Sequence, residues 1–267
     1  MQKTISLLNE EINYFIENEN DTTKPFVLFI HGFGDSLNIM RPIERQENRN
    51  FNIVSLDMPG CGRSTWNQQI TLEHYQEIAL EFVNKVLKDK TFYVVGHSLG
   101  AISTLYVLKN THAKKGLLVA PAHYVSTMPK FIFGKKYLIP ENEQNALESY
   151  MLLSYKNIET MKRSASTYAK LVLDPNTKRK EKFGFMVNEQ MLNPNYIIPK
   201  YWDLYSSVNN YEIASGDQDH YTNIHEVLLV GYQNNKKVHV LKDTGHSAFF
   251  DSGDEINEII INMIKNN

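Results

Sequence analysis

The sequence of 267 residues lacks several features that mark common classes of protein. Cys61 is its only cysteine, which excludes an internal disulfide and a cysteine-based zinc site and fits a reducing compartment. The 28 lysines and arginines nearly balance the 30 aspartates and glutamates, so the chain has no overall basic field for nucleic acid. We therefore expect no nucleic-acid partner.

Long apolar runs are absent as well. No stretch approaches the roughly 20 apolar residues of a membrane span, and residues 1–11 lack the apolar core of a signal peptide. These absences predict a cytoplasmic protein with no transmembrane segment. Peripheral contact with lipid remains open.

Motifs for metals and nucleotides are also missing. The sequence contains no His-Glu-x-x-His pair, no phosphate-binding loop ending in Gly-Lys-Ser/Thr and no Gly-x-Gly-x-x-Gly. Asp217, Asp219 and His220 bring oxygen and nitrogen donors close together, but a cofactor-free role explains Asp219 better. We expect no metal and no cofactor.

Short apolar runs that alternate with helical patterns make up most of the chain. Runs typical of strands buried on both faces occur at residues 26–30, 53–56, 92–95, 116–120, 211–214 and 237–241. Helices are expected over residues 37–47, 72–86, 99–109, 222–233 and 256–264. Thr71 is expected to cap the second of these helices. The alternation predicts a parallel sheet with helices on both faces, preceded by an antiparallel edge strand over residues 12–17.

Residues 121–205 break this alternation. The segment lacks apolar strand runs and has helical patterns over residues 143–155 and 157–173. It holds 12 basic against 8 acidic side chains and 13 of the 30 aromatic residues. This composition suits either a lid over an apolar site or a helical layer with an ordinary core.

Ser98 lies where the strand expected at 92–95 breaks into the next helix. Residues 96–100 read Gly-His-Ser-Leu-Gly, which matches the Gly-x-Ser-x-Gly pattern of a serine on a sharp strand-to-helix turn. Gly96 and Gly100 have a steric reason to be there, because so tight a turn leaves no room for a Cβ at either position. The serine is a candidate nucleophile, although the motif alone also fits a flexible loop.

A serine hydroxyl needs a base, a group that orients the base, and donors for the oxyanion. Several candidate side chains follow predicted strands, and functional groups of open parallel sheets gather at the carboxyl ends of the strands. The segments concerned are 31–34, 57–64, Ser98, Asp219 and His246. We expect them all at one edge of the sheet.

These segments, in this order, resemble the α/β-hydrolase fold superfamily over essentially the full length of the chain. The motifs are His-Gly-Phe-Gly at 31–34, Asp-Met-Pro-Gly-Cys-Gly-Arg-Ser at 57–64, Gly-His-Ser-Leu-Gly at 96–100, Gly-Asp-Gln-Asp at 216–219 and Gly-His at 245–246. The resemblance implies a mostly parallel eight-stranded sheet with a helical cap inserted after the sixth strand. It divides the chain into a core domain of residues 1–120 and 206–267 and a cap of residues 121–205.

The resemblance also implies site residues. Ser98 is the expected nucleophile and His246 the general base, since His239 lies inside a predicted strand. Asp219 is the expected acid, because it matches the superfamily's Gly-x-x-Asp spacing, whereas Asp217 and Asp243 are expected in turns.

The same resemblance assigns the oxyanion donors to the backbone N–H groups of Phe33 and Leu99. Phe33 and His97 are expected to contact substrate as well. Asp57, Arg63 and Ser64 are expected to brace the neighbouring loop.

The sequence therefore predicts a cofactor-independent serine hydrolase that cleaves small apolar esters or acylglycerols through an acyl-enzyme. One alternative is a peptidase, an amidase or a C–C bond hydrolase on the same three residues. A second is a binding protein that kept the fold and lost the chemistry. The fold itself cannot name the substrate, because it supports many reactions.

Overall fold

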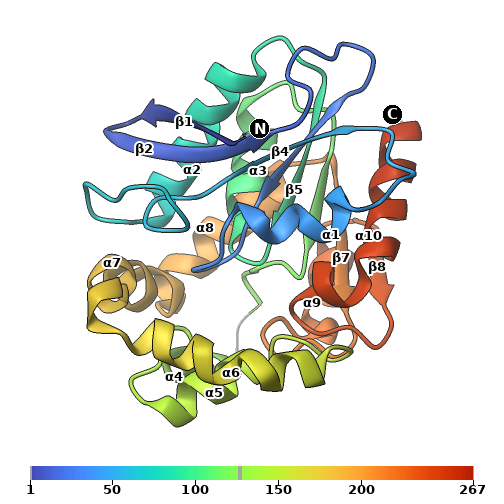
Figure 1. Ribbon diagram of the computed structural model, residues 1–267. Helices are drawn as coiled ribbons and strands as arrows, with labels where there is room; N and C mark the ends of the chain where they lie inside the picture. Colours follow the sequence, from blue (N-terminus) through green and yellow to red (C-terminus); the bar gives the residue numbers. More distant parts are fainter. Residues whose placement is uncertain (1, 126–127, 267) are drawn as a thin grey trace.

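Eight strands form one sheet at the centre of the computed structural model, which describes residues 2–125 and 128–266 (Figure 1). Its strands are β1 Gln2–Leu7, β2 Glu10–Ile16, β3 Phe26–Ile30, β4 Asn52–Leu56, β5 Phe92–His97, β6 Gly116–Val119, β7 Tyr211–Gly216 and β8 Val238–Leu241. Their order across the sheet is β1-β2-β4-β3-β5-β6-β7-β8. Pairs from β4 to β8 are parallel, and the pairs β1–β2 and β2–β4 are antiparallel. The predicted mostly parallel eight-stranded sheet is confirmed.

The edge strand was predicted wrongly. The strand at 12–17 is the inner strand β2, which pairs with β4 on one side, and β1 forms the edge on the other. Leu8 and Asn9 join β1 to β2 with φ values of 47° and 66°, the left-handed backbone of a tight hairpin turn. Only Leu7 is fully buried in β1, so the strand lacks the apolar run that marks the others.

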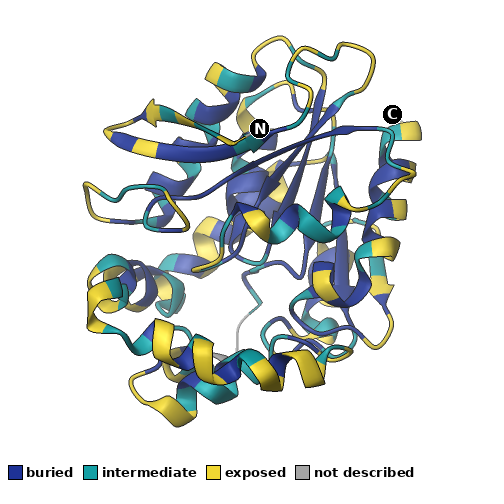
Figure 2. Ribbon diagram, in the orientation of Figure 1, coloured by how far each residue is buried: buried dark blue, intermediate teal, exposed yellow. Residues whose placement is uncertain are grey.

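Helices cover both faces of the sheet. On one face α2 (Leu72–Phe82), α3 (Gly100–Asn110) and α9 (Ile224–Gln233) contribute to the larger apolar core, and on the other α1 (Arg41–Glu44) and α10 (Ala248–Lys265) contribute to a second core. Strand β3 divides its side chains between the two cores in strict alternation. Burial on both faces explains why its sequence is a continuous apolar run (Figure 2).

Two expected helices differ from prediction at their ends. The helix expected at 37–47 is a 3₁₀ turn, Leu37–Met40, followed by the short α1. The closing helix α10 begins eight residues before position 256, with a break where Ser252 adopts φ −141°. The sequence Asp-Ser-Gly at 251–253 is typical of a turn and concealed this first segment. The Thr71 cap is confirmed, since its Oγ1 accepts a hydrogen bond from the backbone N–H of His74 at 3.0 Å.

Helical segments fill the chain between β6 and β7. They are α4 Met128–Tyr137, α5 Glu143–Met151, α6 Ile158–Leu173, a 3₁₀ turn Pro175–Thr177, α7 Arg179–Phe185, a π-helical turn Met186–Met191 and α8 Pro194–Ser207. Helices α4 to α7 lie together below the sheet in Figure 1, and α8 leads back to the sheet, where Tyr205 joins the larger core. The expected boundary between residues 205 and 206 falls inside α8.

Within the described ranges, no helix is both long enough and apolar enough to cross a membrane.

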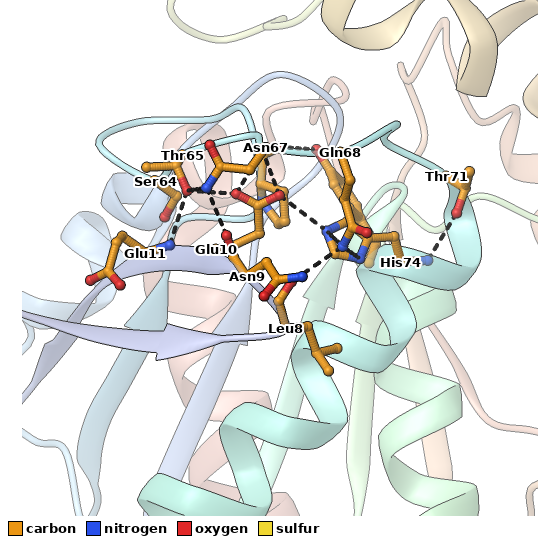
Figure 3. Close-up of polar contacts among 12 residues, drawn as sticks. Leu8, Asn9, Glu10, Glu11, Ser64, Thr65, Asn67, Gln68, Thr71 and His74 are labelled. Atoms are coloured by element: carbon orange, nitrogen blue, oxygen red, sulfur yellow. Dashed lines mark hydrogen bonds and ion pairs between the residues drawn. The ribbon is translucent and has the colours of Figure 1, made fainter.

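A buried carboxylate ties the β1–β2 hairpin to the loop before α2 (Figure 3). Glu10 is completely buried and accepts hydrogen bonds from Thr65 Oγ1 at 2.5 Å and from the backbone N–H of Asn67 at 2.8 Å. His74 Nε2 lies 3.6 Å from its Oε1, and burial lowers the pKa of this imidazole. The buried carboxylate is therefore the acceptor for partly buried donors of this loop.

We predict that Glu10→Ala lowers the free energy of unfolding by about 2 to 4 kcal/mol, because it removes a completely buried acceptor and leaves its partly buried donors unpaired. Urea denaturation measures this change. Glu11→Ala is the matched control, since Glu11 is exposed, and we expect it to change stability by about 0.5 kcal/mol or less. Equal effects of the two substitutions would contradict the role given to Glu10.

Candidate active site

Ser98 lies on a sharp turn between β5 and α3. Its φ is +50°, a left-handed value that a residue with a side chain adopts at a cost of about 1 to 2 kcal/mol. A Cβ on Gly96 would lie 2.6 Å from the carbonyl oxygen of Gly100, and a Cβ on Gly100 would lie 2.3 Å from that of Ile30. The steric reason predicted for the two glycines is therefore confirmed.

The structure brings Ser98, His246 and Asp219 together from three separate loops. His246 Nε2 lies 3.0 Å from Ser98 Oγ, and His246 Nδ1 lies 2.8 Å from Asp219 Oδ2. Asp219 follows β7, Ser98 follows β5 and His246 follows β8, so the parallel sheet holds all three at one edge. This chain of contacts can pass a proton from the hydroxyl to the imidazole and stabilise the imidazolium.

Asp219 is held as a buried carboxylate. Its Oδ1 accepts the backbone N–H groups of Tyr221 at 2.7 Å and Thr222 at 2.9 Å, and its Oδ2 accepts the Thr222 hydroxyl at 2.6 Å. Burial alone would raise the pKa of Asp219, but His246 and the Thr222 donors outweigh it and hold the pKa below its usual range. The acid therefore stays ionised beside the imidazole.

The competing residues lie elsewhere, as expected. Asp217 accepts the backbone N–H of Thr244 at 3.3 Å, and Asp243 is exposed in a left-handed turn. His239 Nε2 lies 2.6 Å from Glu212 Oε2 on neighbouring strands. None of these three residues forms a hydrogen bond with Ser98 or His246 within the described parts of the chain.

Two backbone N–H groups are available to a developing oxyanion. Phe33 and Leu99 line the same cavity as Ser98, and their N–H groups donate no hydrogen bond to any described residue. Leu99 immediately precedes the first turn of α3, where the helix dipole favours negative charge. These observations suit the predicted oxyanion donors.

Hydrogen bonds of His31 and Asp57 hold the loop that carries Phe33 in place. His31 Nδ1 lies 2.7 Å from the carbonyl oxygen of Gly32, and its Nε2 accepts the backbone N–H of Met58 at 3.0 Å. These partners assign the proton to Nδ1. The bracing expected of Asp57 is confirmed, because it accepts the backbone N–H of Leu37 at 2.7 Å.

The same carboxylate organises the loop that follows β4. Asp57 Oδ2 accepts the backbone N–H of Arg63 at 2.9 Å, and the Ser64 hydroxyl donates to the Asp57 carbonyl at 2.7 Å. The exposed Arg63 side chain contributes only a 3.3 Å contact with Gln2. The brace therefore uses the backbone of Arg63.

His97 lies beside His246, the candidate base, and also lines the cavity that contains Ser98. Its Nε2–H donates to the backbone carbonyl of His246 at 2.8 Å, and the two rings are 5.0 Å apart. Burial, reinforced by the neighbouring His246, lowers the pKa of His97 to about 3, so the ring is neutral. Sequence reasoning missed this support of His246, and contact with substrate stays a prediction.

Asp251 is a site residue that sequence reasoning missed. Its Oδ2 accepts the backbone N–H of Gly245 at 2.9 Å and that of Tyr155 at 2.8 Å, and its Oδ1 accepts the Ser154 hydroxyl at 2.5 Å. One buried carboxylate thus joins the loop before His246 to the loop between α5 and α6. Nothing in the Asp-Ser-Gly sequence signals these distant partners.

A cavity of about 470 Å³ opens onto Ser98 and His246. Its lining comes partly from residues 32–35, 97–99 and 246–247 and partly from α4, α5, α6 and α7, among them Tyr137, Tyr150, Met161 and Arg179. A second cavity of about 100 Å³ also touches Ser98, and its lining is mainly apolar: Phe131, Phe133, Leu138, Met191, Leu192, Ile197 and Tyr201 among others. Within the described residues, no group of three or more His, Cys, Asp or Glu side chains could hold a metal ion.

Comparison of the sequence with known proteins shows which family the chain belongs to. The sequence model described as Alpha/beta hydrolase family matches residues 27–259. The chain belongs to the alpha/beta hydrolase family.

Curated alpha/beta hydrolases of differing activity are similar to the chain. Proline iminopeptidase of Saccharolobus solfataricus is 24% identical over 277 residues, covering 95% of this chain and 88% of that protein. Pimeloyl-[acyl-carrier protein] methyl ester esterase of Pseudoalteromonas atlantica is 29% identical over 137 residues, covering 50% of this chain and 48% of that protein. Two further relatives match over less than a third of their own length.

Solved structures of alpha/beta hydrolases share the fold. The 2-hydroxy-6-oxo-6-phenylhexa-2,4-dienoate hydrolase from Rhodococcus sp. strain RHA1 superposes with a TM-score of 0.79 at 16% identity. The match covers 99% of this chain and 98% of that one. At this identity the likeness shows the shared architecture.

We predict that Asp251→Asn lowers kcat by about 10- to 100-fold with little change in KM, because the Gly245 turn that aims His246 loses a charged acceptor. Steady-state kinetics on an aryl ester measures both constants. Asp254→Asn, on the same helix but bonded to Gln46 at 2.6 Å, is the matched control and should leave both constants unchanged. A rise in KM alone would contradict a positioning role for Asp251.

Proposed function

We propose that this alpha/beta hydrolase cleaves carboxylic esters of small apolar acyl groups, or acylglycerols, through an acyl-enzyme. The observation that carries the proposal is the hydrogen-bonded chain Asp219–His246–Ser98, which ends at a hydroxyl in an apolar cavity. The relative from Pseudoalteromonas atlantica is a methyl ester esterase, which supports an ester substrate.

In the first half-reaction the Ser98 hydroxyl attacks the ester carbonyl while His246 Nε2 takes its proton. Asp219 orients the imidazole and stabilises the imidazolium. The tetrahedral oxyanion receives hydrogen bonds from the N–H groups of Phe33 and Leu99. When the C–O bond breaks, His246 returns the proton to the leaving alcohol, and an ester of Ser98 remains.

Water completes the reaction in the second half. His246 removes a proton from a water molecule, the hydroxide attacks the acyl carbonyl, and the proton passes to the Ser98 oxygen as the acid departs. All the groups used belong to the protein, so the proposal requires no cofactor.

We further propose that residues 121–205 act as the cap of a core formed by residues 1–120 and 206–267. The support is the part of the cavity lining that α4 to α7 contribute, in which Tyr137, Tyr150 and Met161 share the cavity with Ser98. The small apolar cavity next to Ser98 suits the acyl group, and the larger cavity suits the leaving alcohol. A short apolar acyl chain is thus the substrate class that we propose.

We predict that Ser98→Ala lowers kcat on 4-nitrophenyl esters by at least about a thousandfold, because no hydroxyl remains to form the acyl-enzyme. A fluorophosphonate probe should label the wild type and Ser247→Ala but not Ser98→Ala. Ser247 is the matched control, since it is the other serine that lines the larger cavity in the described chain. Equal turnover by wild type and Ser98→Ala would refute the nucleophile.

We also predict that kcat/KM passes through a maximum as the acyl chain of the ester is lengthened, because the cavity beside Ser98 has a volume of only about 100 Å³. The measurement compares 4-nitrophenyl esters from acetate to decanoate. An anilide and a vinylogous diketone of the preferred acyl group test the amidase and C–C hydrolase alternatives. Faster turnover of either compound than of the ester would contradict the esterase proposal.

A further inference from the structure

Arg179 is an arginine of α7 that reaches the cavity of Ser98. Its guanidinium lies over the ring of Phe33 at 5.1 Å and near that of Phe183 at 5.6 Å. It also rests against Gly34, where φ is +67° and an added Cβ would lie 2.7 Å from Nη1. The rings of Phe33 and Phe183 and the backbone of Gly34 therefore hold the guanidinium in place.

This guanidinium has almost no acceptor of its own. Nη2 donates to the carbonyl oxygen of Leu138 at 3.3 Å, and the buried Nε has no hydrogen-bond partner among the described residues. No carboxylate of the described chain lies within ion-pair distance of Arg179, although Asp35 lines the same cavity. The guanidinium is thus half-buried and held in place by its neighbours. No carboxylate of the described chain neutralises its charge at ion-pair distance.

Other cations of the same segment are arranged differently. Lys136 pairs with Glu148 at 2.6 Å and Lys180 with Glu141 at 3.0 Å. The side chains of Lys180 and Glu141 are 77% and 74% exposed, so this pair lies in solvent. Arg179 differs because it faces the cavity and forms no ion pair with a carboxylate of the described chain.

We propose that Arg179 binds an anionic group of the substrate, a carboxylate or a phosphate, while Ser98 attacks the ester bond. Removing a charge from water is costly unless an opposite charge compensates it. The planar guanidinium presents parallel N–H groups that match the two oxygens of such an anion. Because Arg179 and Ser98 share one cavity, a single substrate can reach both.

This inference rests on the proposed ester hydrolysis and narrows the substrate to esters that carry an oxyanion. The anion occupies the larger cavity, on the side of Phe33 and Gly34, and the apolar acyl pocket beside Ser98 remains free. Arg179 then selects substrates by charge and takes no part in bond breaking.

Three butyrate esters of equal length, each with the variable group on the leaving alcohol, test the proposal: 4-butyryloxybutanoate, its neutral primary amide, and the phosphonate in which a phosphonic acid replaces the free carboxylate. Wild type should prefer at least one anionic ester over the amide. Arg179→Gln should lower kcat/KM for that ester by about 10- to 100-fold and for the amide by less than about threefold. Preference for the carboxylate or for the phosphonate identifies which anion the site takes.

Two variants serve as controls. Lys180→Gln removes the same charge at the adjacent, solvent-exposed position and should keep the anion preference. Arg179→Lys retains the charge and should retain part of the preference, which decides the matter if Arg179→Gln does not fold. Equal kcat/KM of wild type for anionic and neutral esters, or a preference that survives in Arg179→Gln, would overturn the proposal.

A binding measurement separates this inference from the proposed function. The anionic alcohol 4-hydroxybutanoate and inorganic phosphate are titrated calorimetrically into Ser98→Ala and into the double variant Ser98→Ala/Arg179→Gln. Binding of either compound that the second substitution abolishes supports the anion site even if no ester is hydrolysed. Absence of binding to Ser98→Ala contradicts the site while leaving ester hydrolysis intact.

Discussion

The close approach of β5 and α3 at Ser98 is the constraint on which the rest of the site depends. The turn holds Ser98 at φ +50° and leaves no room for a Cβ on Gly96, which would meet the backbone of Gly100. Gly100 also lies against the end of β3, from which the loop carrying Phe33 departs. One steric arrangement therefore sets the direction of the hydroxyl and the place of both backbone donors.

Buried polar contacts around this turn fix the partners of Ser98 from several directions. Asp219 is saturated with donors from its own loop, so its position does not depend on His246 alone. His97 supports His246 by donating a hydrogen bond to its backbone carbonyl. Asp251 supports it by accepting the backbone N–H of the preceding Gly245. Because Asp251 also binds Tyr155, the loop between α5 and α6 and the loop of the base cannot move independently.

Much of this arrangement could be predicted from sequence, because its causes are local. Strands buried on both faces are apolar without interruption, and the glycine spacing around Ser98 reports a crowded turn directly. Strand β1 escaped prediction because its polar residues face solvent on an edge, where no apolar run is needed. Asp251 and Arg179 escaped for another reason: their partners lie far away in the sequence, so only the folded chain reveals them.

The central claim, that Ser98 carries the acyl group during turnover, is tested most directly by trapping the intermediate. Asp219→Asn mixed with 4-nitrophenyl hexanoate and quenched in acid within the first turnover should contain a hexanoyl group when examined by mass spectrometry. Peptide mapping should place that group on Ser98. A chain that stays unmodified while 4-nitrophenol is released, or a hexanoyl group on another residue, would contradict the account.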